Sequence, residues 1–397
     1  MSTDLTGLFT TSDRDAFFAG LAKAGPVVQG RYVDGTPIWL VTGHEESLAV
    51  LTDPRFSSDL ARQGKLDVAA AAGLPEDVLP YLMRTLGAYD PPDHTRLRGL
   101  VSREFTARRV HALRPRIQEI TDELVDALAG REEADLIEAL AYPLPIRVIC
   151  ELLGVPQADQ DTWRAWSAAL QAADLDGIAA GARGLVAYMG RLIEAKRAEP
   201  GDDLLSALVH ARDRLSDEEL TSVAISILMA GHETTVSLIS SGAFILLTDP
   251  ARADLLRGDA GAMAVAVEEM LRVNGPAEIS PMRFTLEDVE LGGVAIPEGE
   301  VVQIVNAAAN RDPRRFADPD QLILDRSDNA HLGFGHGIHY CLGAALARAE
   351  AEIALHTLLV RLPGLRPAVP AEEITWRPGL VRALTALPVR IRDDAVS

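Results

Sequence analysis

The sequence predicts a mainly α-helical protein with a small β region. Apolar residues recur at helical spacing through most of the 397 residues, whereas strand-like segments are few and lie toward the two ends. One apolar segment spans roughly 30 residues, or about 45 Å of helix. Because this segment is apolar on most faces, we expect it to cross the interior of a large domain.

The long segment, LTSVAISILMAGHETTVSLISSGAFILL, has clear ends. Ser216 and Glu219 form a capping-box pattern before it, and an Asp-Pro pair follows it. His232 and Glu233 lie in its middle, where a transmembrane span would bear them only at considerable cost. We therefore expect a helix buried in protein and no membrane association.

The predicted strands flank tight turns. Residues 30–43, GRYVDGTPIWLVTG, place β-forming residues on both sides of Asp34-Gly35, a pair suited to the positive φ of a hairpin turn. Residues 289–305 indicate further strands joined by two glycines, and residues 380–391 indicate a last strand. These segments make up the small β region.

Composition limits the class of protein. The formal net charge of −20 argues against general affinity for nucleic acid or for an anionic membrane. The two cysteines, Cys150 and Cys341, make no disulfide framework and fit a reducing compartment. Cys150 lies in an apolar helical run and is expected to be a packed core thiol. The first residues show no signal-peptide pattern, so we predict a cytoplasmic protein.

Near its C-terminal end the chain reads HLGFGHGIHYCLGAALARAE, residues 331–350. The glycines before Cys341 predict a tight turn, and apolar spacing predicts a helix from Leu342 onward. Cys341 would then lie at a helix N-terminus, where exposed amides and the helix dipole favour the thiolate. Gly343, one turn into this helix, would leave a flat surface for a broad group.

The residues leave three interpretations of Cys341 open. It could be a buried structural cysteine beside a glycine-rich loop. It could bind zinc with His331, His336 or His339, although structural zinc sites normally show two ligand pairs and no second pair is present. It could also be the single thiolate ligand of a haem iron.

A resemblance favours the third interpretation. The stretch FGHGIHYCLG resembles the haem-binding signature of the cytochrome P-450 family, the haem-thiolate monooxygenases. The matching residues are Phe334, Gly337, Cys341 and Gly343. The resemblance implies that Cys341 is the axial ligand of haem b, with Phe334 and Gly343 contributing to the haem site. It also implies that His339 binds a haem propionate, that the histidine three residues earlier is structural, and that neither binds iron.

The middle of the long helix reads MAGHETTV. His232 and Glu233 suggest a zinc protease, but Val236 occupies the place of the required second histidine. Gly231 beside two threonines predicts a local distortion of the helix, and a satisfied polar patch in a core would fit the residues equally well. The stretch resembles the family's oxygen-activation motif. That resemblance implies that Thr234 hydrogen-bonds oxygen at the haem and that Glu233 helps to deliver protons.

Three further cations match residues that bind haem propionates in this family. His94 and Arg98 stand four apart in DPPDHTRLRGLVSREF, so one face of a helix would carry both. Arg283 in SPMRFTLEDV is the third. A haem carries two propionate carboxylates, and a cluster of cations could bind them through charge-assisted hydrogen bonds. Without the resemblance, each cation would most simply be solvated.

Glu269 and Arg272 are three apart on a predicted helix, where they can touch. The spacing is common and indicates little by itself. The resemblance implies a buried structural pair, to which the family often adds an arginine from a later loop. Gln321 stands at that position, so we expect a neutral hydrogen bond there.

Residues 94–116 hold seven arginines and one acid, Glu104, within a chain of net charge −20. This stretch could be a solvated face, a nucleic-acid contact or a docking surface. We favour docking of an acidic electron donor, because the rest of the molecule would repel nucleic acid.

The resemblance covers nearly the whole chain and implies a single P-450-type domain, residues 1–397, with one long central helix. It is strongest to soluble bacterial members that hydroxylate macrolides and other polyketides, and some relatives act on steroid-like or terpenoid compounds. The implied reaction inserts one oxygen atom from O2 into a C–H or C=C bond of a bulky apolar small molecule. Electrons from NAD(P)H would arrive through a ferredoxin reductase and a ferredoxin.

Two alternatives remain open. A haem-thiolate peroxygenase or isomerase has less need of a proton relay, so Glu233 and Thr234 argue against it. A non-catalytic protein with a cysteine and histidine metal site would contain no haem. The predicted pocket lining is mostly small or aliphatic and names no substrate. Besides the long helix before Gly231, it comprises residues 60–88, 160–190, 277–283 and 379–383.

Overall fold

The computed structural model describes most of the chain. The described residues are 4–11, 13–59, 74–103, 105–170, 175–211 and 215–391. Two compact units are distinguished. The first comprises Met1–Ser57, Val110–Pro145 and Glu233–Ser397, and the second comprises Ser58–Arg109 and Ile146–His232. Each unit is described separately, and the single domain over 1–397 stays a prediction.

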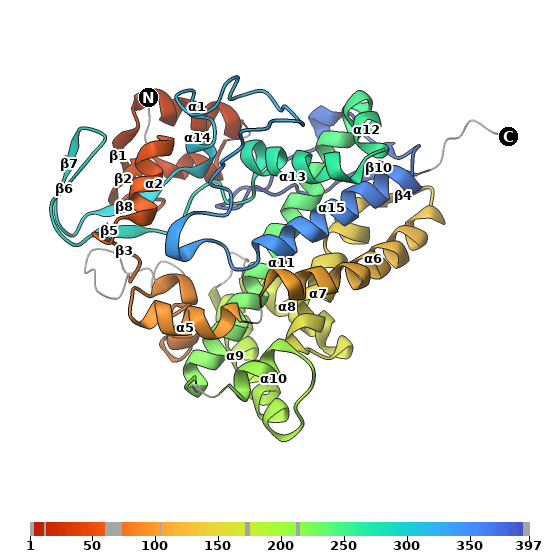
Figure 1. The fold of residues 1–397 in the computed structure, drawn as a ribbon, viewed down its shortest axis with the longest axis horizontal. Helices are drawn as coiled ribbons and strands as arrows, with labels where there is room; N and C mark the ends of the chain where they lie inside the picture. Colours follow the sequence, from red (N-terminus) through yellow and green to blue (C-terminus); the bar gives the residue numbers. More distant parts are fainter. Residues whose placement is uncertain are drawn as a thin grey trace. The chain divides into compact units, whose positions relative to one another are not determined.

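The first unit contains a five-stranded sheet built from both ends of the chain (Figure 1). Its strands, in spatial order, are β1 (Val27–Arg31), β2 (Pro37–Val41), β8 (Val301–Ile304), β5 (Arg283–Thr285) and β3 (Phe56–Ser57). Strands β2 and β8 are parallel and the other neighbours are antiparallel. The predicted hairpin at Asp34-Gly35 is confirmed as β1–β2, and Gly35 has a φ of 87°.

Two smaller sheets complete the β region of the first unit. Strands β6 (Val289–Leu291) and β7 (Val294–Ile296) form the predicted hairpin across two glycines. Strand β10 (Pro388–Arg390), the predicted last strand, pairs with β4 (Glu133–Asp135) and β9 (Arg366–Pro367). The strands are therefore few, as the sequence predicts.

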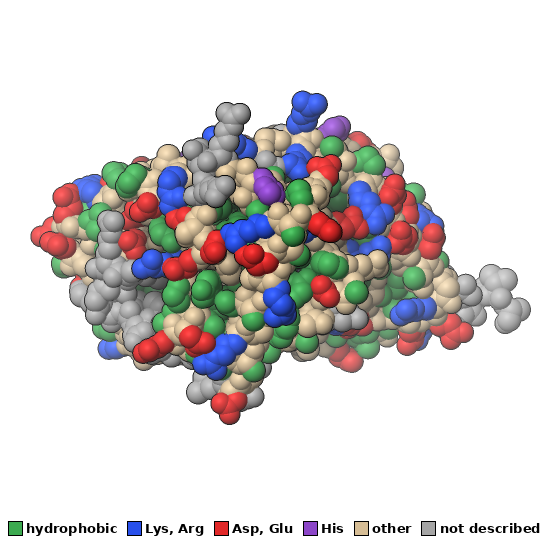
Figure 2. Space-filling model, turned by 90° about the horizontal axis from the view of Figure 1, so that it is seen from below, with side chains coloured by type: hydrophobic (Ala, Val, Ile, Leu, Met, Phe, Trp, Pro, Cys, Tyr) green, Lys and Arg blue, Asp and Glu red, His purple; other side chains and the backbone are tan. Residues whose placement is uncertain are grey.

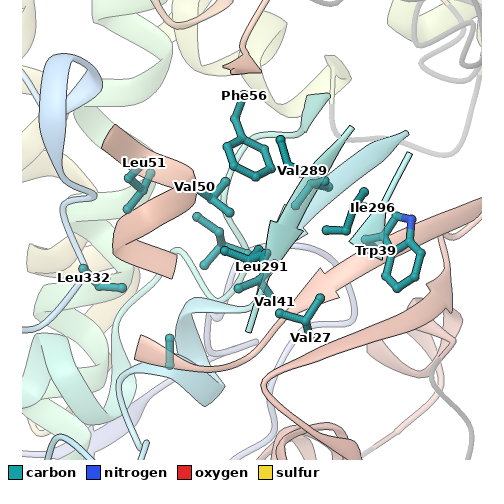
Figure 3. Close-up of a cluster of buried hydrophobic side chains, with 13 residues drawn as sticks. Val27, Trp39, Val41, Val50, Leu51, Phe56, Val289, Leu291, Ile296 and Leu332 are labelled. Atoms are coloured by element: carbon teal, nitrogen blue, oxygen red, sulfur yellow. The ribbon is translucent and has the colours of Figure 1, made fainter. Parts of the chain in front are cut away.

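A cluster of buried apolar side chains joins the five-stranded sheet to its neighbours (Figure 3). Its members are Val27, Trp39, Val41, Val50, Leu51, Phe56, Val289, Leu291, Ile296, Val302, Ile304, Ala309 and Leu332. Leu332 lies in the segment that leads to Cys341, and it is only 2% exposed. The cysteine loop is thus anchored in this core at its start.

Helices make up the rest of the first unit, and α13 packs against α15. Its helical elements are η1 (Leu5–Phe9), α1 (Arg14–Ala24), α2 (His44–Thr52), most of α6 (Ala107–Ala129), the π-helical η5 (Ile137–Ala141), α12 (Pro250–Arg257), α13 (Ala260–Asn274), α14 (Asn306–Ala309), η7 (Gly337–His339), α15 (Ala344–Arg361) and η8 (Ala371–Glu373).

The second unit is helical throughout its described residues, with α9 packed against α8 and α10. Its elements are η3 (Glu76–Val78), α4 (Leu79–Leu82), η4 (Leu86–Ala88), α5 (Asp93–Ser102), most of α7 (Pro143–Leu153), η6 (Gln157–Asp159), α8 (Gln160–Leu170), α9 (Leu175–Ala198) and α10 (Leu204–Val209).

The long helix α11 runs from Asp217 to Leu247. Its predicted capping box is confirmed, because the Ser216 amide donates to the Glu219 carboxylate and the Glu219 amide donates to the Ser216 hydroxyl. The helix continues through Gly231 without a break. A Cβ at Gly231 would lie 2.9 Å from the Ile149 side chain, so this glycine permits close packing against α7.

Helix α11 is long and apolar enough to cross a membrane by length and composition. In its most apolar window, however, 67% of the residues are buried inside the protein, as predicted for a core helix. Figure 2 shows acidic, basic and apolar side chains interspersed over the face that it draws. Positively and negatively charged side chains are therefore mixed on that face and do not form separate patches.

Candidate active site

Cys341 ends a loop whose shape depends on close backbone contacts. Gly337 has a φ of 71°, and a Cβ there would lie 2.6 Å from the Leu51 carbonyl oxygen, so only glycine fits. The Cys341 amide donates to the Phe334 carbonyl over 2.9 Å. Cys341 itself is half-buried. The loop therefore presents its thiol from a defined backbone position.

The helix after Cys341 begins later than predicted. It starts at Ala344 rather than Leu342, with Gly343 as its N-cap at a φ of −85°. The prediction that Gly343 lies one turn into the helix is wrong, because the chain needs Leu342 and Gly343 to turn into the helix axis. A Cβ at Gly343 would meet nothing within 4 Å, so there is open space beside this residue, and the flat surface stays a prediction.

The two cysteines occupy different environments. Cys150 is fully buried, and burial raises the pKa of its thiol to about 12. It therefore stays a thiol at neutral pH, as predicted for a core residue. Cys341, in contrast, lies on the loop described above and is half-buried.

The zinc interpretation finds no support in the described part of the chain. Within those residues, no group of three histidine, cysteine or acidic side chains could hold a metal ion. His331 instead faces Glu268, with 3.2 Å between its Nε2 and the carboxylate. His336 is exposed and His339 is half-buried in η7. Among the described residues, the histidines near Cys341 therefore do not form a group of metal ligands with its thiol.

The predicted propionate ligands lie on three elements. His94 is buried and Arg98 half-buried, one turn apart on α5 of the second unit. In the first unit, Arg283 on β5 is 7% exposed and His339 lies in η7. The Arg283 guanidinium donates to the Phe56 carbonyl over 3.4 Å. These cations are therefore placed by secondary structure rather than by flexible loops.

Glu233 and Thr234 are half-buried neighbours on α11. The Glu233 carboxylate lies 3.5 Å from Nη2 of Arg377, a residue that no sequence motif singles out. The backbone of Arg377 is fixed by a hydrogen bond, because its amide donates to the Ala383 carbonyl over 2.7 Å. No spacing or periodicity connects Glu233 with Arg377, so only the folded chain reveals this pair.

His232 is a satisfied core histidine. It is fully buried, with Nδ1 3.0 Å from the Leu228 carbonyl and Nε2 3.2 Å from the Ser167 hydroxyl. Both ring nitrogens have partners within the second unit. This agrees with the rejection of a zinc protease motif.

Glu269 and Arg272 form a buried ion pair, with both side chains fully buried and 2.7 Å between Nη2 and Oε1. The expected neutral third contact is only partly right. Arg272 does donate to the backbone carbonyl of Gln321, but Nε of Arg326 also donates to Glu269 over 3.0 Å. The third member is therefore a cation five residues beyond the position that the resemblance indicated.

The arginine-rich stretch is partly neutralised by the chain's own acids. Glu104 lies outside the described residues. Ion pairs of the stretch include Arg96 with Glu219, Arg109 with Asp202, Arg114 with Glu352 and Arg116 with Glu119. These pairs reduce the positive charge that a partner would meet.

Similarity over the full length identifies the family. The 6-deoxyerythronolide B hydroxylase of Saccharopolyspora erythraea is 44% identical over 385 residues, covering 94% of this chain and 95% of that protein. The chain belongs to the cytochrome P450 family. The family model for Cytochrome P450 matches residues 263–369 of this P450. The cytochrome P450 monooxygenase PikC of Streptomyces venezuelae is 47% identical over 383 residues, covering 94% of this chain and 90% of that protein.

A solved structure supports the same assignment. The tirandamycin C-bound P450 monooxygenase TamI matches with a TM-score of 0.88 and 41% identity. The match covers 98% of this chain and 100% of that chain. The mainly α fold with one long helix is thus the P450 fold.

Family membership establishes the class of chemistry. This P450 is an oxidoreductase of the monooxygenase type, with haem b as its cofactor and a cysteine thiolate as the iron ligand. It uses electrons that derive from NAD(P)H and that partner proteins deliver. The residues present fit this group, because a haem iron requires a single protein thiolate and Gly343 leaves open space beside the Cys341 loop.

Proposed function

We propose that Cys341 is the thiolate ligand and that this P450 inserts one atom of O2 into a C–H or C=C bond of a bulky apolar natural product, such as a macrolide or another polyketide. The observation that carries the ligand assignment is the contrast between the two cysteines. Cys341 is half-buried at the end of an anchored loop, whereas Cys150 is fully buried and its raised pKa keeps it a thiol.

The haem would be held by its carboxylates and by the cysteine loop. His94, Arg98, Arg283 and His339 are the proposed propionate ligands. Charge-assisted hydrogen bonds to carboxylates are among the strong polar contacts, so buried cations suit this role. Phe334 and Gly343 would border the haem on the cysteine side. Bound there, the haem supplies the activation of O2 that no amino-acid side chain provides.

Glu233 and Thr234 are proposed to supply protons and to orient oxygen. The Thr234 hydroxyl can donate a hydrogen bond, and the Glu233 carboxylate can relay a proton by way of water. Both are half-buried, which suits groups that must reach solvent protons while the site stays largely dry. Nη2 of Arg377 lies 3.5 Å from the Glu233 carboxylate, which would help to orient this acid for proton delivery.

The substrate is proposed to be a large apolar molecule. Residues 277–283 and 379–383, two of the predicted lining segments, contribute apolar side chains such as Ile279, Met282 and Ala383. Of the other predicted lining, residues 60–73 and 171–174 lie outside the described residues. The names of two similar proteins, a 6-deoxyerythronolide B hydroxylase and a tirandamycin C-bound monooxygenase, support a natural product as substrate.

The proposed electron donor is a ferredoxin, reduced by a ferredoxin reductase. Ile338 and Tyr340, on the loop that ends at Cys341, are 50% and 38% exposed, which leaves an apolar contact next to the ligand. Arg103 and Arg108 are exposed in the arginine-rich stretch and would attract an acidic partner. We propose a cytoplasmic enzyme without membrane or nucleic-acid partners, in keeping with the net charge of −20.

The ligand assignment is tested by the absorption spectrum of the reduced protein under carbon monoxide. Wild type and Cys150→Ala should both give a strongly red-shifted Soret band, and Cys341→Ala should lose it. Cys150→Ala is the matched control because it removes the chain's other thiol. A red-shifted band in Cys341→Ala, or a folded wild-type protein that binds no haem, would contradict the proposal.

The substrate and partner proposals need separate assays. A panel of macrolide aglycones and steroids of similar size would be titrated, and products heavier by one oxygen atom would be sought by mass spectrometry. Turnover should require O2 and be supported by a ferredoxin with its reductase. Conversion by hydrogen peroxide alone at the same rate would argue for a peroxygenase instead.

A further inference from the structure

A single cation on α15 contacts both ends of the cysteine loop. Nε and Nη2 of Arg348 donate to the two carboxylate oxygens of Glu268 over 2.6 and 2.8 Å. Nη1 donates to the Tyr340 hydroxyl over 3.1 Å, and the guanidinium lies 4.4 Å from the centre of the Phe334 ring. Phe334 begins the signature motif and Tyr340 directly precedes Cys341.

Glu268 is itself fixed by the segment that leads into the loop. The Gly333 amide donates to Nδ1 of His331 over 3.0 Å, so the ring proton resides on Nε2, which donates to Glu268 over 3.2 Å. Burial would raise the pKa of Glu268, but the hydrogen bonds from Arg348 and His331 lower it to about 2. Glu268 is therefore an anion with two fixed donors.

The contact on Phe334 reaches Cys341 through the backbone. The Phe334 carbonyl accepts the Cys341 amide, so a movement of Phe334 also moves the residue that carries the thiol. The Phe334 and Tyr340 rings meet edge to face, with 6.4 Å between centres. Cation–π contact and ring packing together restrict how Phe334 can move.

We propose that Arg348, fixed by Glu268, is a positioning residue that holds the Cys341 loop in the geometry required for thiolate ligation. This proposal rests on the assignment of Cys341 made above. The set of Glu268, His331, Phe334, Tyr340 and Arg348 is called the Arg348 clamp. The fork of the guanidinium is needed, because one flat group pairs with a carboxylate along its edge while its face covers an aromatic ring. A lysine ammonium cannot do both.

The Arg348 clamp is distinct from the ion pair at the neighbouring acid. Glu269 contacts Arg272 and Arg326, and its side chain is fully buried, whereas the side chain of Glu268 is 28% exposed. The two adjacent acids of α13 thus hold different segments. Glu269 secures the segment around residues 321–329, and Glu268 secures the loop that ends at Cys341.

The test uses the haem-loaded enzyme with single substitutions in the clamp. Arg348→Met, Arg348→Lys and Glu268→Gln would be compared with Arg315→Met. Arg315 is a matched control, because it also pairs with an acid (Asp328), lies 5.1 Å from an aromatic ring centre, and is 28% exposed. It lies outside the cysteine loop.

The readout is the carbon monoxide spectrum of the reduced protein during mild denaturant treatment, followed beside circular dichroism of the fold. Arg348→Met should convert the red-shifted Soret band to the ordinary haem band on the order of tenfold faster than wild type, before helicity is lost. Arg348→Lys should convert nearly as fast. Glu268→Gln should be intermediate, and Arg315→Met should match wild type.

Three outcomes would overturn the proposal. Conversion of Arg348→Met within about twofold of wild type would show that the loop holds its geometry without the clamp. An equal effect of Arg315→Met, or loss of the band only together with helicity, would show general destabilisation. If Arg348→Met does not fold, Arg348→Lys and Glu268→Gln carry the same comparison. A wild-type enzyme without the red-shifted band would instead defeat the assignment of Cys341.

Discussion

The loop around Cys341 and the Glu233-Thr234 stretch of α11 are held in contrasting ways. The loop is anchored by Leu332 in an apolar core, by close backbone contacts and by Arg348, whose side chain is 28% exposed. Glu233 pairs at 3.5 Å with an Arg377 side chain that is 44% exposed. The loop is thus fixed from several directions, whereas the ion pair at Glu233 is longer and its arginine is more exposed.

The difference matches the tasks proposed for the two sites. A metal ligand must stay at one position, so preorganisation by neighbouring contacts is an advantage. A residue that relays protons must exchange them with water, so a weak ion pair near solvent suits it better. Partly exposed pairs contribute only about 0–1 kcal/mol. Because the Arg348–Glu268 pair is also partly exposed, the position of the Cys341 loop depends on several contacts together rather than on one strong ion pair.

The largest expected effect is at the buried ion pair of Glu269, the acid next to the one that secures the Cys341 loop. Arg272→Met leaves Glu269 as a buried charge with fewer partners, and it should lower the free energy of unfolding by about 3–5 kcal/mol. Arg252→Met is the control, because Arg252 pairs with Asp249 at the same spacing but is 39% exposed. Denaturant titration of both variants checks the difference, and equal losses would contradict the role of burial.

The next effect concerns the Glu233-Thr234 stretch. If Thr234 has the role proposed above, Thr234→Ala should uncouple electron use from product, because the proposed hydrogen-bond donor to oxygen would be gone. Product formed per NAD(P)H should fall by on the order of tenfold, with peroxide released instead. Thr235→Ala, at a buried neighbour, should couple normally. The measurement is the amount of peroxide and of product formed by both variants. Unchanged coupling in Thr234→Ala would contradict the proposed role of Thr234 in proton delivery.

A smaller effect is expected at the ion pair itself. Arg377→Met removes the cation that lies 3.5 Å from the Glu233 carboxylate, so the Glu233 side chain should be less well oriented for proton delivery. Product formed per NAD(P)H should fall by about twofold or less, because a partly exposed ion pair contributes little. Coupling in Arg390→Met, another partly exposed arginine with an acid partner, should match wild type. Unchanged coupling in Arg377→Met would contradict a role for the pair.

A last effect, on stability alone, tests how well the helix behind the cysteine loop excludes water. Glu350 on α15 is 1% exposed, and burial raises its pKa well above the ordinary value. The folded protein therefore keeps this proton while the unfolded chain releases it above pH about 4.5, so the stability contribution of Glu350 falls as pH rises. Glu350→Gln should be more stable than wild type at pH 8, with the gain shrinking toward pH 5. Denaturation at the two pH values measures it, and a pH-independent difference would mean that water reaches Glu350.

Prediction from the sequence succeeded where the signal is local. The capping box at Ser216 and the hairpin turn at Asp34-Gly35 each depend on residues within a few positions of one another. It was less accurate at the start of α15, because a helix can begin at any of several residues after a turn. The exact cap depends on how the preceding loop is packed.

The sequence alone determined the mainly α class, the ends of the long helix and the few strands, since backbone preferences and motif spacing act over short distances. The choice of Cys341 stays a prediction. Only the tertiary structure decided the partners of the charged side chains. Arg326 reaches Glu269 across 57 positions, and Arg348 reaches Glu268 across 80. A long charged side chain has no periodicity that points to its partner, so the fold must bring the two together before either can be identified.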